Sequence, residues 1–147
     1  MPRGGRTAVD ARAPVPLTAM MAEHQKREMR DHLRVVQEVT AALVRDDCDA
    51  IATSASRIAW SPQQAAKCKH MGAGAPGFAA MGEPFHKTAD QIGDAARRRD
   101  RSGVAHALDA TLQACVGCHD SYRQDIVASA PAGSPAMEDS CPMRQGQ

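Results

Sequence analysis

Apolar residues recur three or four positions apart in four stretches of this chain, and this spacing predicts four amphipathic helices. The first stretch runs from about residue 20 to 44 and carries Met29, Leu33, Val36, Thr40 and Leu43. The second carries Ile51, Ala55 and Ile58. The third carries Met81, Phe85, Ala89, Ile92 and Ala96. The fourth carries Val104, Leu108, Thr111, Leu112, Cys115, Cys118, His119, Tyr122 and Ile126.

Helix-capping and helix-breaking residues separate these stretches. Asp46 and Asp47 form a short break, in which a side-chain oxygen can cap the second helix. Pro62 should end or kink that helix, and Ser61 before it opens a capping-box pattern from which a short helix can restart. The glycines between residues 72 and 77 predict the clearest internal loop, which divides the helices into two pairs.

The composition favours one helical domain between two flexible ends. The chain has 147 residues, enough for a single core, and aromatic residues make up only 3% of it. A core of Leu, Ile, Val, Met and Ala suits close-packed helices better than a sheet. We therefore expect an all-α protein with a flexible segment at residues 1–18, a helical domain at 19–127 and a flexible tail at 128–147.

Net charge and hydropathy restrict the partners of the protein. The formal net charge is +1, so there is no general electrostatic attraction toward nucleic acid or an anionic membrane. No apolar run approaches the length of a transmembrane helix. We expect neither a nucleic-acid partner nor a membrane span.

The pentapeptide at residues 115–119 reads Cys-Val-Gly-Cys-His, the CxxCH pattern at which haem is attached covalently. Cys115 and Cys118 can each add to one haem vinyl group, and His119 then lies under the iron as proximal ligand. A zinc site would need further ligands nearby, and a thioredoxin-like dithiol would follow a strand; the sequence indicates neither. The motif predicts one covalent haem c, with a haem-free dithiol or metal-binding module as an alternative.

The late position of the motif determines where a sixth iron ligand can come from. Almost all of the foldable chain lies upstream of it, and the tail after residue 128 is rich in Ala, Ser, Pro and Gly. Such a tail cannot wrap a haem, so Met137 and Met143 are poor candidate ligands. We expect the opposing ligand upstream of Cys115.

These features resemble the cytochrome c′ class of four-helix-bundle cytochromes. The resemblance covers about residues 20–127 and rests on the late motif, on Tyr122 and Arg123 after it, and on an N-terminal amphipathic helix with Met29. It implies an antiparallel four-helix bundle with the haem between the first and last helices. It also implies His119 as proximal ligand, Met29 on the distal side and Tyr122 and Arg123 beside the haem, and it suggests a homodimer.

The distal residue divides that class by function. An apolar residue leaves five-coordinate iron that binds small gases such as nitric oxide or carbon monoxide, whereas methionine gives low-spin iron suited to electron transfer. Met29 favours electron transfer, although an inward methionine can also simply fill a helical core. His32, about one turn later, is the rival and would give bis-histidine iron; it can equally be a half-exposed helix histidine.

A second group of soft ligands lies near the middle of the chain. Cys68, His70 and Met71 are residues that bind copper, and Met81 and His86 follow not far along the chain. Their spacing matches no defined copper site, and short groups of this kind are common in loops.

The remaining cysteines and a run of arginines are open to two interpretations each. Cys48, Cys68 and Cys141 are surplus to the haem, and in an oxidising compartment they can pair within or between chains. The arginines at 97–99, with Arg101, either dock an acidic redox partner or form a solvated helix end.

The haem motif also bears on location. Covalent attachment of haem c normally takes place outside the cytoplasm, yet residues 1–18 contain arginines without the apolar stretch of a secretory signal. We therefore expect a periplasmic protein whose signal was removed or whose start is misassigned. Its expected function is to carry single electrons between redox partner proteins through His119/Met29 iron, without being an enzyme; gas binding is the alternative.

Overall fold

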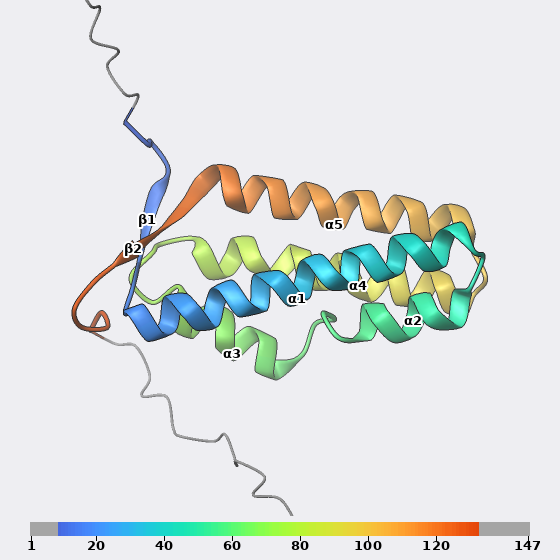
Figure 1. Ribbon diagram of the computed structural model, residues 1–147, viewed down its shortest axis with the longest axis horizontal. Helices are drawn as coiled ribbons and strands as arrows, with labels where there is room; N and C mark the ends of the chain where they lie inside the picture. The colour runs from blue at the N-terminus through green and yellow to red at the C-terminus, as the bar shows by residue number, and fades with distance from the viewer. Residues whose placement is uncertain (1–8, 133–147) are drawn as a thin grey trace, which may run out of the picture.

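The computed structural model describes residues 9–132, which fold mainly into helices (Figure 1). In chain order the elements are β1 Ala13–Leu17, α1 Ala19–Val44, α2 Cys48–Ser56, α3 Pro62–Met71, α4 Phe78–Arg97, α5 Arg101–Ser121 and β2 Tyr122–Ile126. The three longest helices, α1, α4 and α5, run along the length of the molecule. Helix α4 packs against α2, α3 and α5, whereas α1 packs mainly against α2. Within residues 9–132, no helix is long and apolar enough to cross a membrane, as the sequence predicted.

Side-chain caps confirm the predicted starts of the second and third of these helices. The Asp47 carboxylate accepts a hydrogen bond from the amide of Ala50 at 3.0 Å, and α2 begins there. The Ser61 hydroxyl accepts one from the amide of Gln64 at 3.1 Å, and Pro62 is the first residue of α3. Both caps pair amide donors that the first turn of a helix leaves without a partner.

The main core lies on the side of α1 that faces α2 and α4. Val35, Val39 and Ala42 of α1 are buried there. They pack with Ile51, Ala55, Ile58, Phe85, Ala89, Ile92, Ala95, Ala96, Val104, Ala107 and Leu108. The core is therefore built mainly from aliphatic side chains and alanines, as the low aromatic content implied.

On α1, the residues that are buried in the core form a stripe next to the apolar stripe predicted from the sequence. Met29 and Leu33 are 39% and 71% exposed, and Thr40 is exposed as well. Successive residues of a helix are about 100° apart, so the stripe of Val35 and Val39 lies beside the predicted one and obeys the same spacing. On the predicted stripe, Met29, Leu33 and Thr40 therefore face away from the core.

Two short strands were not expected. They pair in parallel, from Ala13 beside Tyr122 to Leu17 beside Ile126. Strand β1 lies in the segment at 1–18 that was expected to be flexible, and β2 lies where the fourth helix was expected to continue. Residues 13–17 are therefore a strand and not a flexible segment, and residues 122–126 are a strand and not the end of a helix.

Proline spacing explains why the first of these segments is extended. Pro14 and Pro16 have no amide hydrogen to donate, which disfavours a helix and suits an edge strand. Val15 and Leu17 alternate with them and are buried at 2% and 0% exposure. The cluster that buries them also contains Met21, Ala22, Met71 and Ala75. This second apolar cluster joins β1 to α1 and α3.

Candidate functional site

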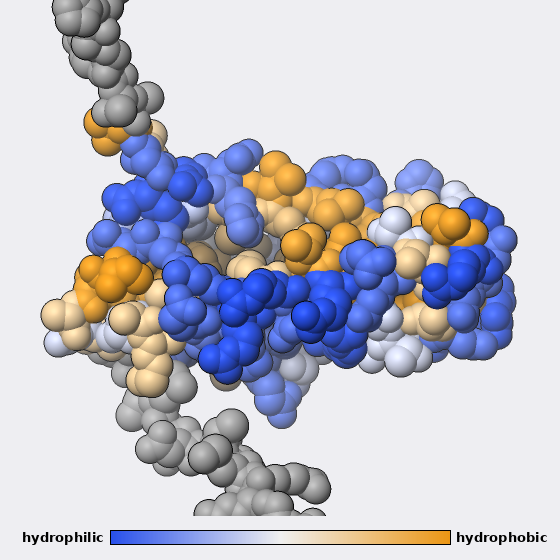
Figure 2. All heavy atoms as spheres, viewed as in Figure 1, coloured by the Kyte–Doolittle hydropathy of each residue, from blue (hydrophilic) through white to orange (hydrophobic). Residues whose placement is uncertain are grey.

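A pocket of about 430 Å³ opens between α1, α3, α4 and α5. Helices α1 and α5 touch at few positions, and the pocket lies where they separate. On the face drawn in Figure 2, hydrophobic residues gather over α5 and α1 beside a hollow in the surface. Large apolar side chains that remain exposed on these two helices include Met29, Leu33, Leu112 and Val116. The molecule thus presents an apolar, recessed surface between its first and last helices.

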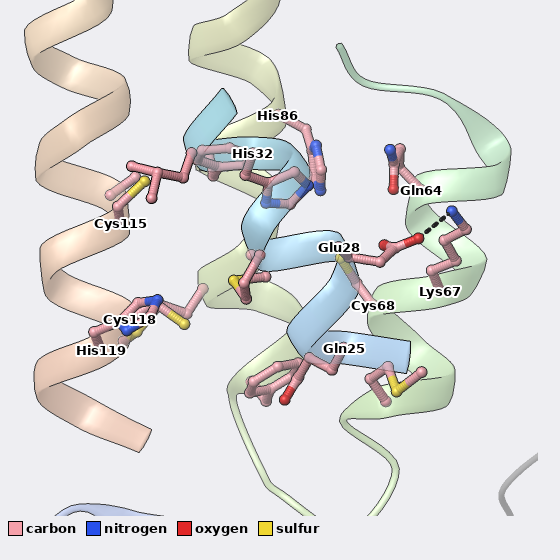
Figure 3. Close-up of a pocket in the computed structure, with 18 of the residues that line it drawn as sticks. Gln25, Glu28, His32, Gln64, Lys67, Cys68, His86, Cys115, Cys118 and His119 are labelled. Atoms are coloured by element: carbon pink, nitrogen blue, oxygen red, sulfur yellow. Dashed lines mark hydrogen bonds and ion pairs between the residues drawn. The ribbon is translucent and has the colours of Figure 1, made fainter. Parts of the chain in front are cut away.

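The CxxCH residues form the wall of this pocket that belongs to α5. Cys115, Cys118 and His119 all line it, and Figure 3 shows the two thiols directed from α5 toward the space beside α1. Both cysteines are free and half-buried, whereas His119 is exposed. The structure therefore brings the three residues of the motif to one pocket wall.

The two thiols of the motif are held in their neutral form. Burial raises the pKa of both Cys115 and Cys118 above the usual range, and for Cys115 the neighbouring Cys118 adds to the effect. Catalytic dithiols instead have a lowered pKa, because the thiolate is their nucleophile. The two thiols therefore lack the lowered pKa that a catalytic dithiol has.

The predicted stripe of α1 lines the opposite side of the pocket. Met29, Leu33 and Val36 are among the lining residues; Met29 and Leu33 are exposed, and Val36 is partly buried against the core. Met29 and His119 therefore lie in the same pocket, on α1 and α5. The apolar stripe predicted for the first helix thus includes residues that line this pocket.

Two neutral histidines also line the pocket. His86 is 4% exposed, and its Nδ1 lies 2.7 Å from the carbonyl oxygen of Ile58. A carbonyl oxygen can only accept, so Nδ1 carries the hydrogen and Nε2 keeps its lone pair. The His32 ring lies 5.6 Å from that of His86 and 4.7 Å from that of Phe85. Burial, and next the neighbouring His86, lowers the pKa of His32 to about 4, and burial lowers that of His86.

Sequence reasoning did not place His86 at this pocket. It named this residue only as a neighbour of the copper-binding candidates, whereas it named His32 as the rival of Met29; both His32 and Met29 line the pocket. The hydrogen bond to Ile58 joins residues 28 positions apart, and no local pattern in the sequence signals it. Only the packing of α4 against the end of α2 brings the two together.

Tyr122 and Arg123 lie beyond the end of α5, and neither lines the pocket. The Tyr122 hydroxyl donates a hydrogen bond to the carbonyl of Pro76 at 2.9 Å. Its ring packs edge-on against Phe78, a lining residue, with 5.4 Å between ring centroids. Arg123 Nη1 lies 3.5 Å from the Asp125 carboxylate, and its buried Nε has no hydrogen-bond partner among residues 9–132. Tyr122 thus supports one pocket wall from behind.

The soft-ligand residues are only partly brought together. Cys68, Met71, Met81 and His86 line the pocket, and His70 does not. Among the described residues, no group of three or more His, Cys, Asp or Glu side chains is placed to hold a metal ion. Cys48 and Cys68 are free thiols on different helices, and Cys141 lies outside the described residues.

The donor set of the pocket fits a haem. One wall presents two neutral thiols and an imidazole in CxxCH order, and α1 contributes a thioether, Met29, together with apolar Leu33 and Val36 and several polar side chains. Thiols, an imidazole and a thioether are the groups that attach haem c and ligate its iron. Comparison of the chain with protein-family models, curated proteins and solved structures finds no match.

Proposed function

We propose that this protein is a c-type cytochrome that carries single electrons through one covalently bound haem. The observation that carries the proposal is the placement of Cys115, Cys118 and His119 on one wall of an apolar pocket whose facing wall contains Met29. When bound, the haem supplies an Fe(III)/Fe(II) couple, which exchanges one electron at a time.

The proposal includes an antiparallel four-helix bundle of the cytochrome c′ class, made of α1, α2, α4 and α5. Its support is the packing of α4 against α2 and α5, and of α1 against α2. Helix α3 is then an addition that covers one side of the pocket, where Cys68 and Met71 line it. The haem site between the first and last helices follows from the same assignment.

Cys115 and Cys118 attach the cofactor. Each thiol adds across one vinyl C=C bond, with its sulfur bonding to one carbon and its proton going to the other. The addition consumes no oxidant or reductant. It does require reduced thiols, and both cysteines are free.

His119 and Met29 then set the electronic properties of the iron. His119 would supply an imidazole and Met29 a thioether to the haem iron. A thioether favours the ferrous state and raises the reduction potential relative to a second nitrogen ligand. The apolar side chains of Leu33 and Val36 line the same wall. These roles suit an electron carrier of the periplasm that serves redox partner proteins, not an enzyme.

A gas-binding haem protein is the second candidate. The observation in its favour is the neutral pair of His32 and His86 in the pocket, because an imidazole N–H can donate a hydrogen bond to an iron-bound diatomic ligand. In that case Met29 packs on the wall without binding iron.

One set of absorption spectra separates the two functions. Full-length protein from a host that matures c-type cytochromes is recorded oxidised, reduced, and reduced under carbon monoxide. An electron carrier with methionine-ligated iron gives low-spin spectra that carbon monoxide changes slowly. High-spin spectra that carbon monoxide changes at once would replace electron transfer by gas binding. Absence of covalent haem would overturn both.

A further inference from the structure

A pair of charged side chains, Glu28 and Lys67, lies on one side of the pocket. Glu28 and Arg30 of α1 and Lys67 of α3 are the formally charged residues among those that line it, with the histidines neutral. The lining residues of α4 and α5 include no Asp, Glu, Lys or Arg. Figure 3 shows Glu28 and Lys67 on the side away from Cys115 and Cys118. The two sides of the pocket therefore suit chemically different edges of a bound molecule.

A haem has two such edges. Its vinyl groups project from one edge, and its two propionate carboxylates project from the opposite edge. Thioether bonds at Cys115 and Cys118 put the vinyl edge against α5, so the propionates must face away from α5. Building on the proposed function, we propose that Lys67 binds a haem propionate, with the Gln64 amide as a neighbouring donor.

Lys67 is suited to this role by its position and its present partner. Its Nζ donates a hydrogen bond to Glu28 Oε1 at 2.7 Å, so the ammonium already lies against a carboxylate at the pocket wall. An ammonium has three hydrogens, and one carboxylate leaves donors for another. The side chain is 45% exposed, so its stem can adjust without disturbing the core.

Glu28 competes with the propionate for the same ammonium. Its Oε1 lies between Lys67 and His24, whose Nε2 is 3.5 Å away. A second carboxylate beside Glu28 is disfavoured by like-charge repulsion unless a cation lies between them. Removal of Lys67 and removal of the Glu28 charge should therefore change propionate binding in opposite directions.

The test is resonance Raman spectroscopy of the full-length holoprotein, because the propionate bending band reports hydrogen bonding to the propionates. Lys67→Met should shift this band toward that of a free propionate, and Glu28→Gln should shift it the other way. The reduction potential gives a second measurement: it should fall in Lys67→Met and rise in Glu28→Gln, since positive charge near the iron favours the ferrous state. Lys69→Met is the matched control, because Lys69 is an exposed residue of α3 that does not line the pocket.

Two outcomes would overturn the inference. A propionate band that is the same in wild type and Lys67→Met means that the ammonium binds Glu28 alone. A shift in Lys69→Met as large as that in Lys67→Met means that net charge, not contact, moves the band. Both results leave covalent haem and the proposed function intact, whereas a chain without covalent haem would overturn the two together.

Discussion

The guanidinium of Arg12 donates a hydrogen bond from Nη1 to the carbonyl oxygen of His119 at 3.2 Å, across 107 positions of sequence. The same nitrogen lies 3.5 Å from the carbonyl oxygen of Tyr122, and Asp10 holds the guanidinium from the other side at 2.7 Å. Carbonyl groups in the last turn of a helix have no partner within the helix. Arg12 pairs the carbonyl of His119, the residue proposed to bind iron.

Replacement of Arg12 by alanine should lower the thermal midpoint by a few degrees, because it unpairs these carbonyls and the Asp10 carboxylate. Circular dichroism of the holoprotein measures the midpoint. The hydrogen bond from Arg12 holds the pKa of Asp10 at about 2, and in the variant that pKa should return toward 3.8. The stabilisation from this pair is present above pH 3.8 and is lost as the pH falls through 2. Arg27→Ala serves as control, because Arg27 is an exposed residue of α1. An equal fall of the thermal midpoint in Arg27→Ala would show that the hydrogen bonds of Arg12 do not stabilise the protein.

Covalent attachment should depend on two cysteines only. The double variant Cys115→Ala with Cys118→Ala should contain no haem after denaturing electrophoresis, since each thioether needs its own sulfur. Single changes of Cys48, Cys68 or Cys141 to alanine should leave haem staining at the wild-type level. A stained band from the double variant would show that the haem assignment is wrong.

Substitution of Met29 should change the iron without changing attachment. Met29→Ala should give high-spin iron, faster carbon monoxide binding and a lower reduction potential, because a thioether favours the ferrous state. His32→Ala should do none of these, since His32 is not the proposed ligand. Absorption spectra and potentiometry measure both variants. If wild type is already high-spin, Met29 is a packing residue and the gas-binding candidate becomes the better account.

The haem should also contribute to folding. It would cover apolar side chains of the pocket that are otherwise exposed, such as Leu33 and Leu112 at 71% and 41% exposure. Protein made without haem attachment should therefore unfold at a lower temperature and less cooperatively than holoprotein. Thermal unfolding followed by circular dichroism compares the two, and equal midpoints would mean that the haem is not part of the apolar core.

Stability should fall in mildly acidic solution because of the buried histidines. The pKa of His32 is lowered to about 4, so between pH 6.5 and 4 the unfolded chain binds a proton that the folded chain excludes. The free energy of unfolding then decreases as the pH falls, by at most about 1.4 kcal/mol per pH unit for this proton. Urea unfolding from pH 7 to 4.5 measures the slope. His32→Phe should flatten it, and His106→Phe, an exposed site on α5, should leave it unchanged.

Local signals in the sequence predicted the helices and the motif-bearing wall of the pocket. Asp47 and Ser61 cap α2 and α3 as expected, since a cap depends on residues only three positions apart. The grouping of Cys115, Cys118 and His119 on one wall follows from helical spacing alone. Both features depend on residues close together in the sequence, so they can be predicted without knowing which helices pack together.

The features that could not be predicted from the sequence depend on long-range packing. Spacing alone does not distinguish the stripe of Met29 and Leu33 from that of Val35 and Val39. The helices that pack against α1 determine which of the two stripes is buried. Strand β1 forms through pairing with residues more than a hundred positions away. His86 reaches the pocket through a hydrogen bond to Ile58 on the segment after α2.

The parallel pairing of β1 with β2 also sets the order in which parts of the domain can fold during synthesis. Strand β2 begins three residues after His119, so β1 has no partner until the CxxCH motif has been synthesised. A chain that stops before residue 122 therefore leaves β1 without the strand that pairs with it. The buried positions of Val15 and Leu17 can be completed only after residues 115–119 have been made, so the N-terminal strand joins the domain last.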